Sequence, residues 1–350
     1  MPHRWVPLAT LVSTILLFGC GSASPAAPTP SPVVDGGSAD ASSLDSTPST
    51  DGIEALATED CAGWKGAAGA HCTTLRISCD AEAARTVTLR AVAPTVTERG
   101  TIIFFSGGDG AKYYADGKAD ALLQRLVNDG FRVVERMWET GGWFPSTHGP
   151  AAATCRSAAI GRYVRDHFAN GHALCATGNS GGALELGYVL AHHDGDEVLD
   201  LAVLTSGPPG RLDHACPGAA DWSASCAAIA STQTWACGAP ACALGPDLAT
   251  IIDTSYGTPR CSKPLPGDPA FVSDSLSGGK TNFTHARIEL FFGDGDCGPT
   301  PLALEWASSI TSRGAPAPAT VLAQTGHNLF SYPNGSDAIA TAMKDHCTRD

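Results

Sequence analysis

Short apolar runs alternate with amphipathic segments along most of this chain. Residues 101–105 (TIIFF) are apolar without interruption, which is typical of a strand buried on both faces of a sheet. Residues 120–128 (DALLQRLVN) carry apolar side chains at helical spacing, and Asp129-Gly130 then ends the pattern. A second strand is expected over 131–137. This alternation predicts an α/β fold in which helices flank a mostly parallel central sheet.

The same alternation continues to the C-terminus with one interruption. Residues from about 207 to 285 are rich in Gly, Pro and Cys and show little periodicity, so we interpret them as a disulfide-rich insertion that caps the sheet. On either side of it the pattern predicts strands over 86–92, 172–177, 199–205, 286–292 and 319–323, and helices over 152–168, 181–193, 301–312 and 337–346.

The N-terminus (MPHRWVPLATLVSTILLFGCGSAS) has the organisation of an export signal. Arg4 forms a short basic region, residues 6–18 are apolar, and small residues follow at a candidate cleavage point. The apolar stretch is too short to span a bilayer as a mature helix. Residues 17–20 (LFGC) resemble the bacterial lipobox, in which the signal is cut before a cysteine that receives lipid through its thiol. The alternative is an ordinary secretory signal with an unrelated cysteine, and either interpretation exports the protein.

The residues that follow, up to about 58, are rich in Ser, Pro, Ala, Gly and Asp and almost free of large apolar side chains. Such a segment cannot bury enough surface to offset the entropy of ordering it. We therefore predict a signal peptide over 1–19, a lipidated Cys20 with a flexible tether over 20–58, and a folded domain over 59–350. The predicted location is the bacterial cell envelope, with the lipid anchor as the protein's contact with a membrane, or the medium if Cys20 is not lipidated.

Composition narrows the class of partner. The 350 residues are 43% hydrophobic and 16% charged, which is sufficient for a full apolar core. The formal net charge is −13, with 22 basic against 35 acidic residues and no Lys/Arg-rich run. This balance argues against nucleic acid or an anionic membrane surface as the main partner and leaves the oligomeric state open.

Cysteine usage indicates an oxidising compartment. The chain has 13 cysteines, and setting Cys20 aside leaves an even number in an exported protein, which favours disulfides whose pairing stays open. The spacing of Cys237 and Cys242 is also compatible with a metal site, but no pair of histidines has matching spacing. We therefore expect neither a metal ion nor a cofactor.

One short motif carries candidate chemistry. Residues 175–183 (CATGNSGGA) place Ser180 in a Gly-x-Ser-x-Gly pattern that two unrelated classes of serine hydrolase share. Residues 70–72 (AHC) resemble the segment around the catalytic histidine of chymotrypsin-like proteases. Those proteases are all-β double barrels, however, whereas Ser180 lies between a predicted strand and a predicted helix. No convincing acid lies between His71 and Ser180 to complete their triad.

From about Thr86 to the C-terminus the chain resembles the α/β-hydrolases instead. The nucleophile of that family sits on a sharp turn from strand to helix, where small residues allow the close packing of the two elements. Gly178, Gly181 and Gly182 supply such residues around Ser180. The family's triad follows in the chain order serine, acid, histidine, with the acid and the histidine each in a loop after a late strand.

Two late loops match that order. The predicted strand 286–292 leads into GDGD (293–296), similar to the acid loop, and the strand 319–323 leads into GHNLF (326–330), a frequent form of the histidine loop. The resemblance implies a triad of Ser180, Asp296 and His327. Asp294 is an alternative acid.

The resemblance also implies an oxyanion hole. It would combine the backbone N–H of Gly181 with an N–H from residues 106–110 (SGGDG), donated by Gly108 or Asp109. This loop is similar to the family's His-Gly-Gly-Gly only in part, because Ser106 occupies the position of the histidine.

The function implied is that of an exported serine hydrolase. It would cleave an ester in a small molecule or a polymer through an acyl-enzyme intermediate, without a cofactor. A peptidase on the same fold and a non-catalytic, surface-anchored binding module are the alternatives. The aromatic residues of 137–144 (MWETGGWF) either line the substrate pocket or pack against other loops.

Overall fold

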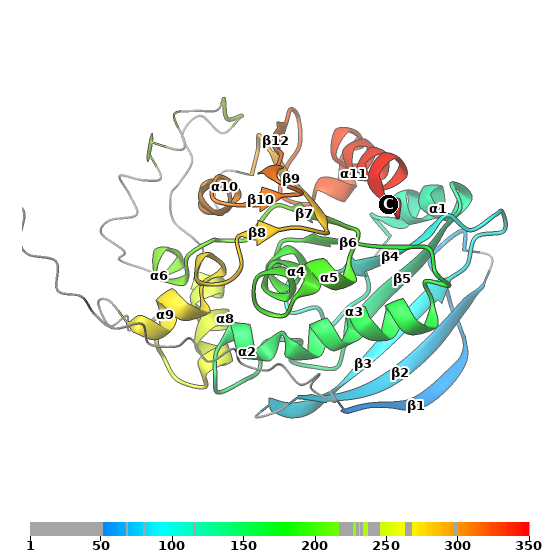
Figure 1. The fold of residues 1–350 in the computed structure, drawn as a ribbon, viewed down its shortest axis with the longest axis horizontal. Helices are drawn as coiled ribbons and strands as arrows, with labels where there is room; N and C mark the ends of the chain where they lie inside the picture. The colour runs from blue at the N-terminus through cyan, green and yellow to red at the C-terminus, as the bar shows by residue number, and fades with distance from the viewer. Residues whose placement is uncertain are drawn as a thin grey trace, which may run out of the picture. The chain divides into compact units, whose positions relative to one another are not determined.

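The structure, a computed structural model, contains one large sheet flanked by helices (Figure 1). Nine strands pair in the order β1-β2-β3-β5-β4-β6-β7-β9-β12. The strands from β5 to β12 run parallel, whereas β1, β2 and β3 pair antiparallel with their neighbours. The residues that the structure describes are 52–67, 69–79, 82–114, 117–216, 227–228, 231, 234–236, 246–262, 268–296 and 300–349.

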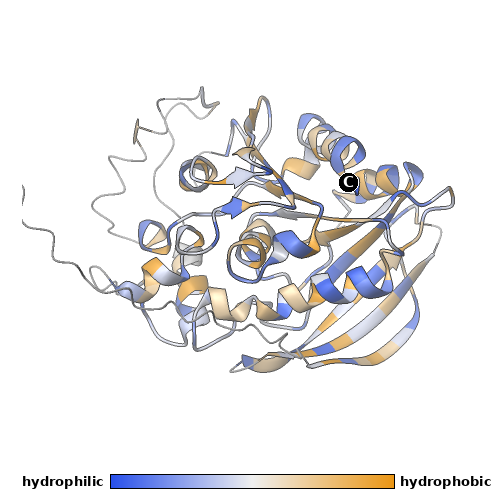
Figure 2. Cartoon of the chain, viewed as in Figure 1, coloured by the Kyte–Doolittle hydropathy of each residue, from blue (hydrophilic) through white to orange (hydrophobic). Residues whose placement is uncertain are grey.

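The strands of the large sheet follow the apolar runs of the sequence. Their bounds are β1 Gly52–Cys61, β2 Ala70–Cys79, β3 Glu82–Val92, β4 Gly100–Phe105, β5 Phe131–Trp138, β6 Ala173–Asn179, β7 Leu201–Thr205, β9 Arg287–Gly293 and β12 Ala319–Leu322. A small second sheet contains β8 Asn282–Phe283, β10 Thr311–Ser312 and β11 Ala315–Pro316. Figure 2 shows alternating apolar and polar bands along β1, β2 and β3, as expected for strands with one solvated face.

Two apolar cores lie on the two faces of the sheet. Strand β4 contributes to both, because successive side chains of a strand point to opposite faces: Ile103 belongs to one core and Ile102 to the other. The first core includes helices α3 (Cys155–His167) and α4 (Gly181–His192), and the second includes α1 (Asp120–Asn128) and α11 (Pro333–His346). This arrangement confirms the predicted α/β class with helices on both faces.

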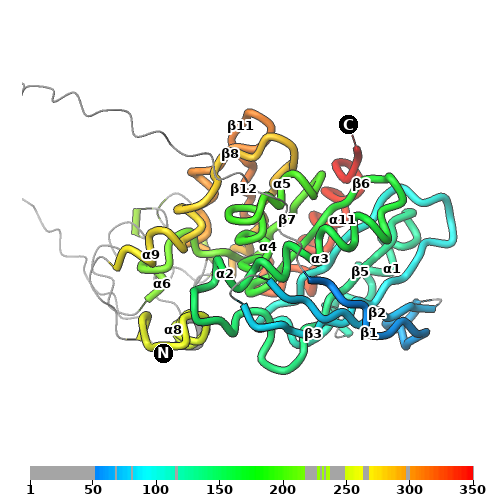
Figure 3. Tube along the Cα trace, turned by 60° about the horizontal axis from the view of Figure 1, so that its bottom comes forward, coloured from blue at the N-terminus to red at the C-terminus, as the bar shows by residue number. Residues whose placement is uncertain are grey.

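Several predicted boundaries are wrong. The strand β1 begins at Gly52, so the predicted tether extends too far toward residue 58. The predicted helix 301–312 is the shorter α10 (Thr300–Ala307), and the predicted helix 152–168 is divided into α2 (Pro150–Ala153) and α3. Strands β1 and β2 are not among the predicted strands. The side chains of β1 are mostly exposed and lack an apolar pattern. What holds β1 is its backbone ladder with β2 (Figure 3).

Disulfides connect distant parts of the described chain. Cys61 pairs with Cys72, Cys79 with Cys155, Cys175 with Cys347 and Cys216 with Cys261. The last pair lies within the predicted insertion, of which the structure describes α6 (Leu212–Ala215), α8 (Pro246–Tyr256), α9 (Pro269–Asp274) and the short η1 (Leu276–Gly278). The signal peptide, Cys20 and most of the tether lie outside the described residues, as do Cys226, Cys237, Cys242 and Cys297. None of the described helices is both long and apolar enough to cross a membrane.

Candidate active site

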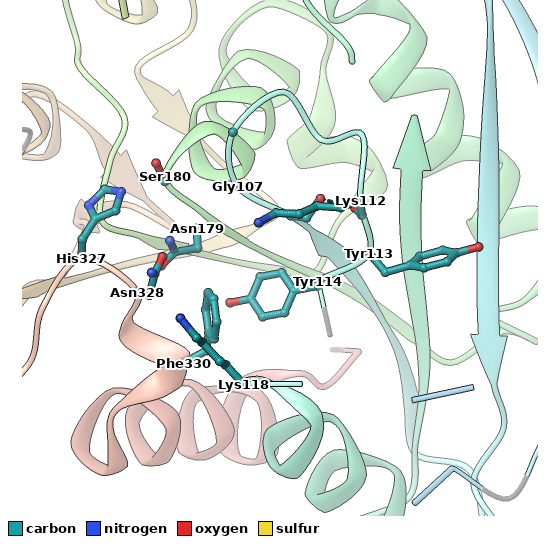
Figure 4. Close-up of a pocket in the computed structure, with 12 residues that line it drawn as sticks. Gly107, Lys112, Tyr113, Tyr114, Lys118, Asn179, Ser180, His327, Asn328 and Phe330 are labelled. Carbon is teal, nitrogen blue, oxygen red and sulfur yellow. Dashed lines mark hydrogen bonds between the residues drawn. The ribbon is translucent and has the colours of Figure 1, made fainter. Parts of the chain in front are cut away.

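The predicted site residues meet at one edge of the sheet. Ser180 directly follows β6, Asp296 follows β9, and His327 follows β12. Because these strands run parallel, their carboxyl ends point to the same edge, where the loops after them come together. Figure 4 shows the side chains of Ser180 and His327 at the cavity that both residues line.

The turn at Ser180 is a strained strand-to-helix elbow. Its backbone has φ 56° and ψ −120°, outside the conformations that a residue with a Cβ atom normally adopts. The N–H of Ser180 donates to the carbonyl of Thr205 at 2.9 Å, and its carbonyl accepts from the N–H of Leu184 at 3.0 Å. The elbow is therefore held from the neighbouring strand β7 and from the first turn of α4.

Glycine is required where this elbow packs against its surroundings. A Cβ atom on Gly178 would overlap the backbone of Gly182, and one on Gly181 would overlap the carbonyl of Gly108. The helix α4 thus starts in direct contact with its own strand and with the loop after β4. This contact brings the N–H groups at the start of α4 close to the loop that the sequence predicts for the oxyanion.

His327 is oriented by Asp296. The His327 Nδ1 lies 3.0 Å from Asp296 Oδ1, and the carboxylate is buried while the imidazole is partly exposed. A carboxylate can only accept a hydrogen bond, so Nδ1 is the donor in this contact, and in a neutral imidazole Nε2 is then the acceptor. The imidazole therefore offers a proton acceptor to a group beside it.

Asp294 has a different environment from Asp296. Its two carboxylate oxygens accept from the backbone N–H groups of Gln324 and Thr325, each at 3.0 Å. These contacts fasten the start of the histidine loop to the end of β9. Of the two aspartates that the sequence left as candidates, the one in contact with His327 is Asp296.

A buried ion pair connects helix α4 with strand β5. Arg136 on β5 donates to Glu185 on α4, and neither side chain is exposed. The remaining Glu185 oxygen accepts from Trp138 Nε1 at 3.0 Å and from Ser157 Oγ at 2.7 Å. Burial raises the pKa of Glu185 and lowers that of Arg136, and in each case the partner's charge opposes the effect of burial.

Arg136 also fixes the glycine-rich loop itself. Its guanidinium donates to the Ser106 Oγ at 3.0 Å, to the Ser106 carbonyl at 3.1 Å and to the Gly110 carbonyl at 2.9 Å. Ser106 occupies the position where the α/β-hydrolase loop often has histidine, and here it accepts hydrogen bonds from this arginine. One fully buried guanidinium therefore sets the positions of the loop and of α4 together.

The loop and the elbow enclose a cavity of about 220 Å³. Gly107 and Gly108 line it, but Asp109 does not: the Asp109 carbonyl accepts from Trp143 N, and its carboxylate accepts from Ala111 N. Its lining residues are Ser106, Gly107, Gly108, Lys112, Tyr113, Tyr114, Lys118, Asn179, Ser180, His327, Asn328 and Phe330.

Comparison with solved structures identifies this architecture. An esterase from Pyrobaculum calidifontis matches with a TM-score of 0.52 at 18% sequence identity, covering 85% of this chain and 87% of that one. A thermostable carboxylesterase cloned from a metagenomic library matches with a TM-score of 0.50 at 15% identity, covering 85% of this chain and 92% of that one. The chain has the α/β-hydrolase fold. No protein-family model and no curated protein matches the sequence.

On this α/β-hydrolase fold, the aromatic residues at the end of β5 and in the loop after it pack inside the protein. Trp138, Trp143 and Phe144 are buried and belong to the first apolar core, and none of them lines the cavity. Of the two tryptophans of the insertion, Trp235 is buried and Trp222 lies outside the described residues. His71 is exposed on β2 beside Asp60, which agrees with its rejection as a catalytic histidine.

The pair of Arg136 and Glu185 and most residues that line the cavity are not among the site residues predicted from the sequence. Glu185 is the one charged residue of the apolar segment 183–191 (ALELGYVLA), and an isolated charge in a buried element is a signal for a buried partner. Arg136 directly follows Glu135 in its strand and gives no such isolated signal. Lys112 and Lys118 lie between elements, where the sequence holds no periodic pattern. Among the described residues, no group of three or more His, Cys, Asp or Glu side chains is arranged to hold a metal ion.

The buried pair yields a prediction for stability. Arg136→Met and Glu185→Gln each leave one buried charge without its partner, and each should lower the free energy of unfolding by about 3–5 kcal/mol. The double variant removes both charges. Its loss of free energy of unfolding should therefore be smaller than the sum of the two single losses, by about 1–3 kcal/mol. Urea unfolding with the disulfides intact measures the free energy of unfolding of the wild type, the two single variants and the double variant. Additive losses, within about 0.5 kcal/mol, would show that the two side chains are not coupled.

Proposed function

We propose that this protein is a serine hydrolase that cleaves a carboxylic ester through an acyl-enzyme intermediate. The observation that carries the proposal is the contact of His327 Nδ1 with Asp296 at 3.0 Å, on a histidine that lines the same cavity as the strained Ser180. A backbone strained at one serine persists only where the surrounding structure enforces it, and such strain is concentrated at functional sites. This favours catalysis over a non-catalytic binding module.

In the proposed reaction, His327 Nε2 takes the proton from Ser180 Oγ as the oxygen attacks the ester carbonyl carbon. The tetrahedral oxyanion accepts hydrogen bonds from the N–H of Gly181 and from an N–H of Gly107 or Gly108. His327 then gives its proton to the leaving alcohol, and the acyl group stays on Ser180. A water molecule, deprotonated by His327, attacks the acyl-enzyme and releases the acid.

Two features narrow this proposal. Gly107 and Gly108 line the cavity whereas Asp109 does not, so we propose the N–H of Gly107 or Gly108 as the donor that this loop contributes to the oxyanion hole. Ester cleavage is proposed ahead of peptide cleavage because both solved structures described above are named as esterases. No metal ion or cofactor has a step in this chemistry.

We also propose that the protein works outside the cytoplasm, anchored through a lipid on Cys20. The support is the signal-like N-terminus with its LFGC segment. The four disulfides among the described residues are independent support, because such bonds persist in oxidising compartments.

The nucleophile is tested with a fluorophosphonate probe and p-nitrophenyl esters. The wild-type protein should be labelled and should hydrolyse short esters, because Ser180 Oγ would be activated by His327. Ser180→Ala should lose the label and at least about 10³-fold in kcat, with folding checked by circular dichroism. A folded wild-type protein that neither reacts with the probe nor cleaves any ester or peptide anilide would contradict an enzymatic function.

The acid is tested by a matched pair of variants. Asp296→Asn leaves His327 without its carboxylate and should lower kcat by about 10³-fold or more. Asp294→Asn weakens the attachment of the histidine loop and should lower kcat by less than about tenfold, mainly through stability. Esterase assays and thermal unfolding of both proteins compare the two effects. A larger loss of kcat for Asp294→Asn would overturn the assignment.

A further inference from the structure

The cavity beside Ser180 is polar along most of its wall. Among the described residues that line it, none is Ala, Val, Leu, Ile or Met, and each one except Phe330 and the two glycines carries a hydroxyl, amide, ammonium or imidazole group. Pockets for small molecules are usually lined mainly by apolar side chains and enclose about 300–1,000 Å³. At about 220 Å³ this cavity is smaller and more polar. It therefore suits a small group with several hydrogen-bonding atoms better than an alkyl chain.

Asn179 presents a buried amide to this cavity. It is the last residue of β6, directly before Ser180, and it is 1% exposed. Its Oδ1 accepts from Thr205 Oγ1 at 2.9 Å, so the end of the neighbouring strand β7 holds the amide in place. No described residue accepts a hydrogen bond from its Nδ2 group. A buried amide donor without an acceptor costs about 1–3 kcal/mol, and a ligand in the cavity can supply that acceptor.

Asn328 brings a second amide to the same cavity. It directly follows His327 and is the N-cap residue of the short helix η2 (Leu329–Ser331). Its side-chain amide makes no hydrogen bond to any described residue. In the view of Figure 4 both amides lie between the pair of Ser180 and His327 and the ring of Phe330. One amide therefore extends from each of the two segments that carry the proposed nucleophile and its base.

Aromatic rings and a second polar space adjoin these amides. The ring centres of Tyr114 and Phe330, which both line the cavity, lie 4.8 Å apart. A groove of about 490 Å³ shares two lining residues with the cavity, and its described lining residues are Lys118, Asn328, Ser331 and Tyr332. A sugar ring has C–H groups on its faces and hydroxyls at its edges, so it matches aromatic surfaces combined with amides.

We propose that the substrate is an acylated carbohydrate, and that Asn179 and Asn328 bind hydroxyl groups of the sugar close to the ester. This inference rests on the function proposed above. A carboxamide both donates and accepts hydrogen bonds, as a hydroxyl does, so the two groups are complementary. Hydrolysis by water would release the acid and leave a free sugar hydroxyl in place of the ester. The two asparagines would select the substrate and take no part in proton transfer.

The test compares esters that differ only in the hydroxyls of the sugar. One pair carries the ester on a primary carbon: methyl 6-O-acetyl-α-D-glucopyranoside and its 2,3,4-trideoxy analogue. The other carries it on a ring carbon: methyl 3-O-acetyl-β-D-xylopyranoside and its 2,4-dideoxy analogue. In at least one pair, kcat/KM for acetate release should be about tenfold or more higher for the hydroxylated member. The reason is that the deoxy ester leaves the amides of the site unpaired.

Variants assign the preference to the two amides. In Asn179→Leu and in Asn328→Leu the ratio of kcat/KM for the hydroxylated to the deoxy ester should fall by about threefold or more. Asn328→Gln keeps an amide and should retain most of the ratio. Because Asn328 is exposed, its variants keep the test decisive if Asn179→Leu does not fold.

Asn128→Leu is the matched control. It removes the amide of an exposed asparagine at the end of α1, which lines neither the cavity nor the groove. It should therefore retain the wild-type ratio.

The outcomes separate this inference from the function on which it rests. Suppose that Ser180-dependent hydrolysis of p-nitrophenyl acetate is observed. Failure to cleave either sugar ester, or equal kcat/KM within both pairs, would then overturn the carbohydrate substrate and leave the hydrolase standing. A preference for the hydroxylated ester that persists in Asn328→Leu and in folded Asn179→Leu would overturn the role of the amides. Absence of Ser180-dependent hydrolysis of all these esters would overturn both proposals.

Discussion

The close backbone packing around Ser180 is the constraint on which the rest of the site depends. Residue 180 keeps a left-handed φ of 56° because its N–H is bonded to β7, its carbonyl is bonded within α4, and glycines on either side leave no Cβ atom in the way. Such a conformation costs about 1–3 kcal/mol and must be balanced by contacts elsewhere. The parallel sheet provides that balance, since both strands beside the elbow are buried and fully paired.

The buried Arg136–Glu185 pair extends this constraint to the loop after β4. In the sheet, β4 lies between β5 and the strand β6 that precedes Ser180, and Arg136 of β5 forms its ion pair with Glu185 of α4. In doing so it bonds Ser106 and Gly110, at the two ends of the glycine-rich loop. Helix α4, the loop after β4 and the backbone at Lys112 are therefore joined by one connected set of hydrogen bonds.

Much of this arrangement follows from the sequence, for identifiable reasons. The helix Asp120–Asn128 has the bounds that its apolar spacing predicts, and β6 and α4 follow from an apolar run, a small-residue turn and a second apolar segment. The contact between Asp296 and His327 is what the resemblance of their two loops to those of the α/β-hydrolases implies. The helices and strands can be predicted from the local spacing of apolar residues because each of them buries an apolar face of its own.

The features that the sequence does not predict depend on contacts between distant parts of the chain, which no local sequence pattern specifies. The strand β1 is exposed and is defined by its ladder with β2, so its residues resemble a linker in the sequence. The choice between Asp294 and Asp296 depends on which carboxylate meets backbone N–H groups and which meets an imidazole. The pairing of Arg136 with Glu185 joins residues that are distant in the chain. These contacts are properties of the assembled fold.

A crystal structure of the protein after reaction with an alkyl phosphonate tests the central claim most directly. The account predicts phosphorus bonded to Ser180 Oγ, with His327 Nε2 facing the leaving-group side of the adduct. One phosphonyl oxygen should lie within about 3 Å of the Gly181 N and of the N of Gly107 or Gly108. An adduct on another residue, or a phosphonyl oxygen directed away from these N–H groups, would contradict the account.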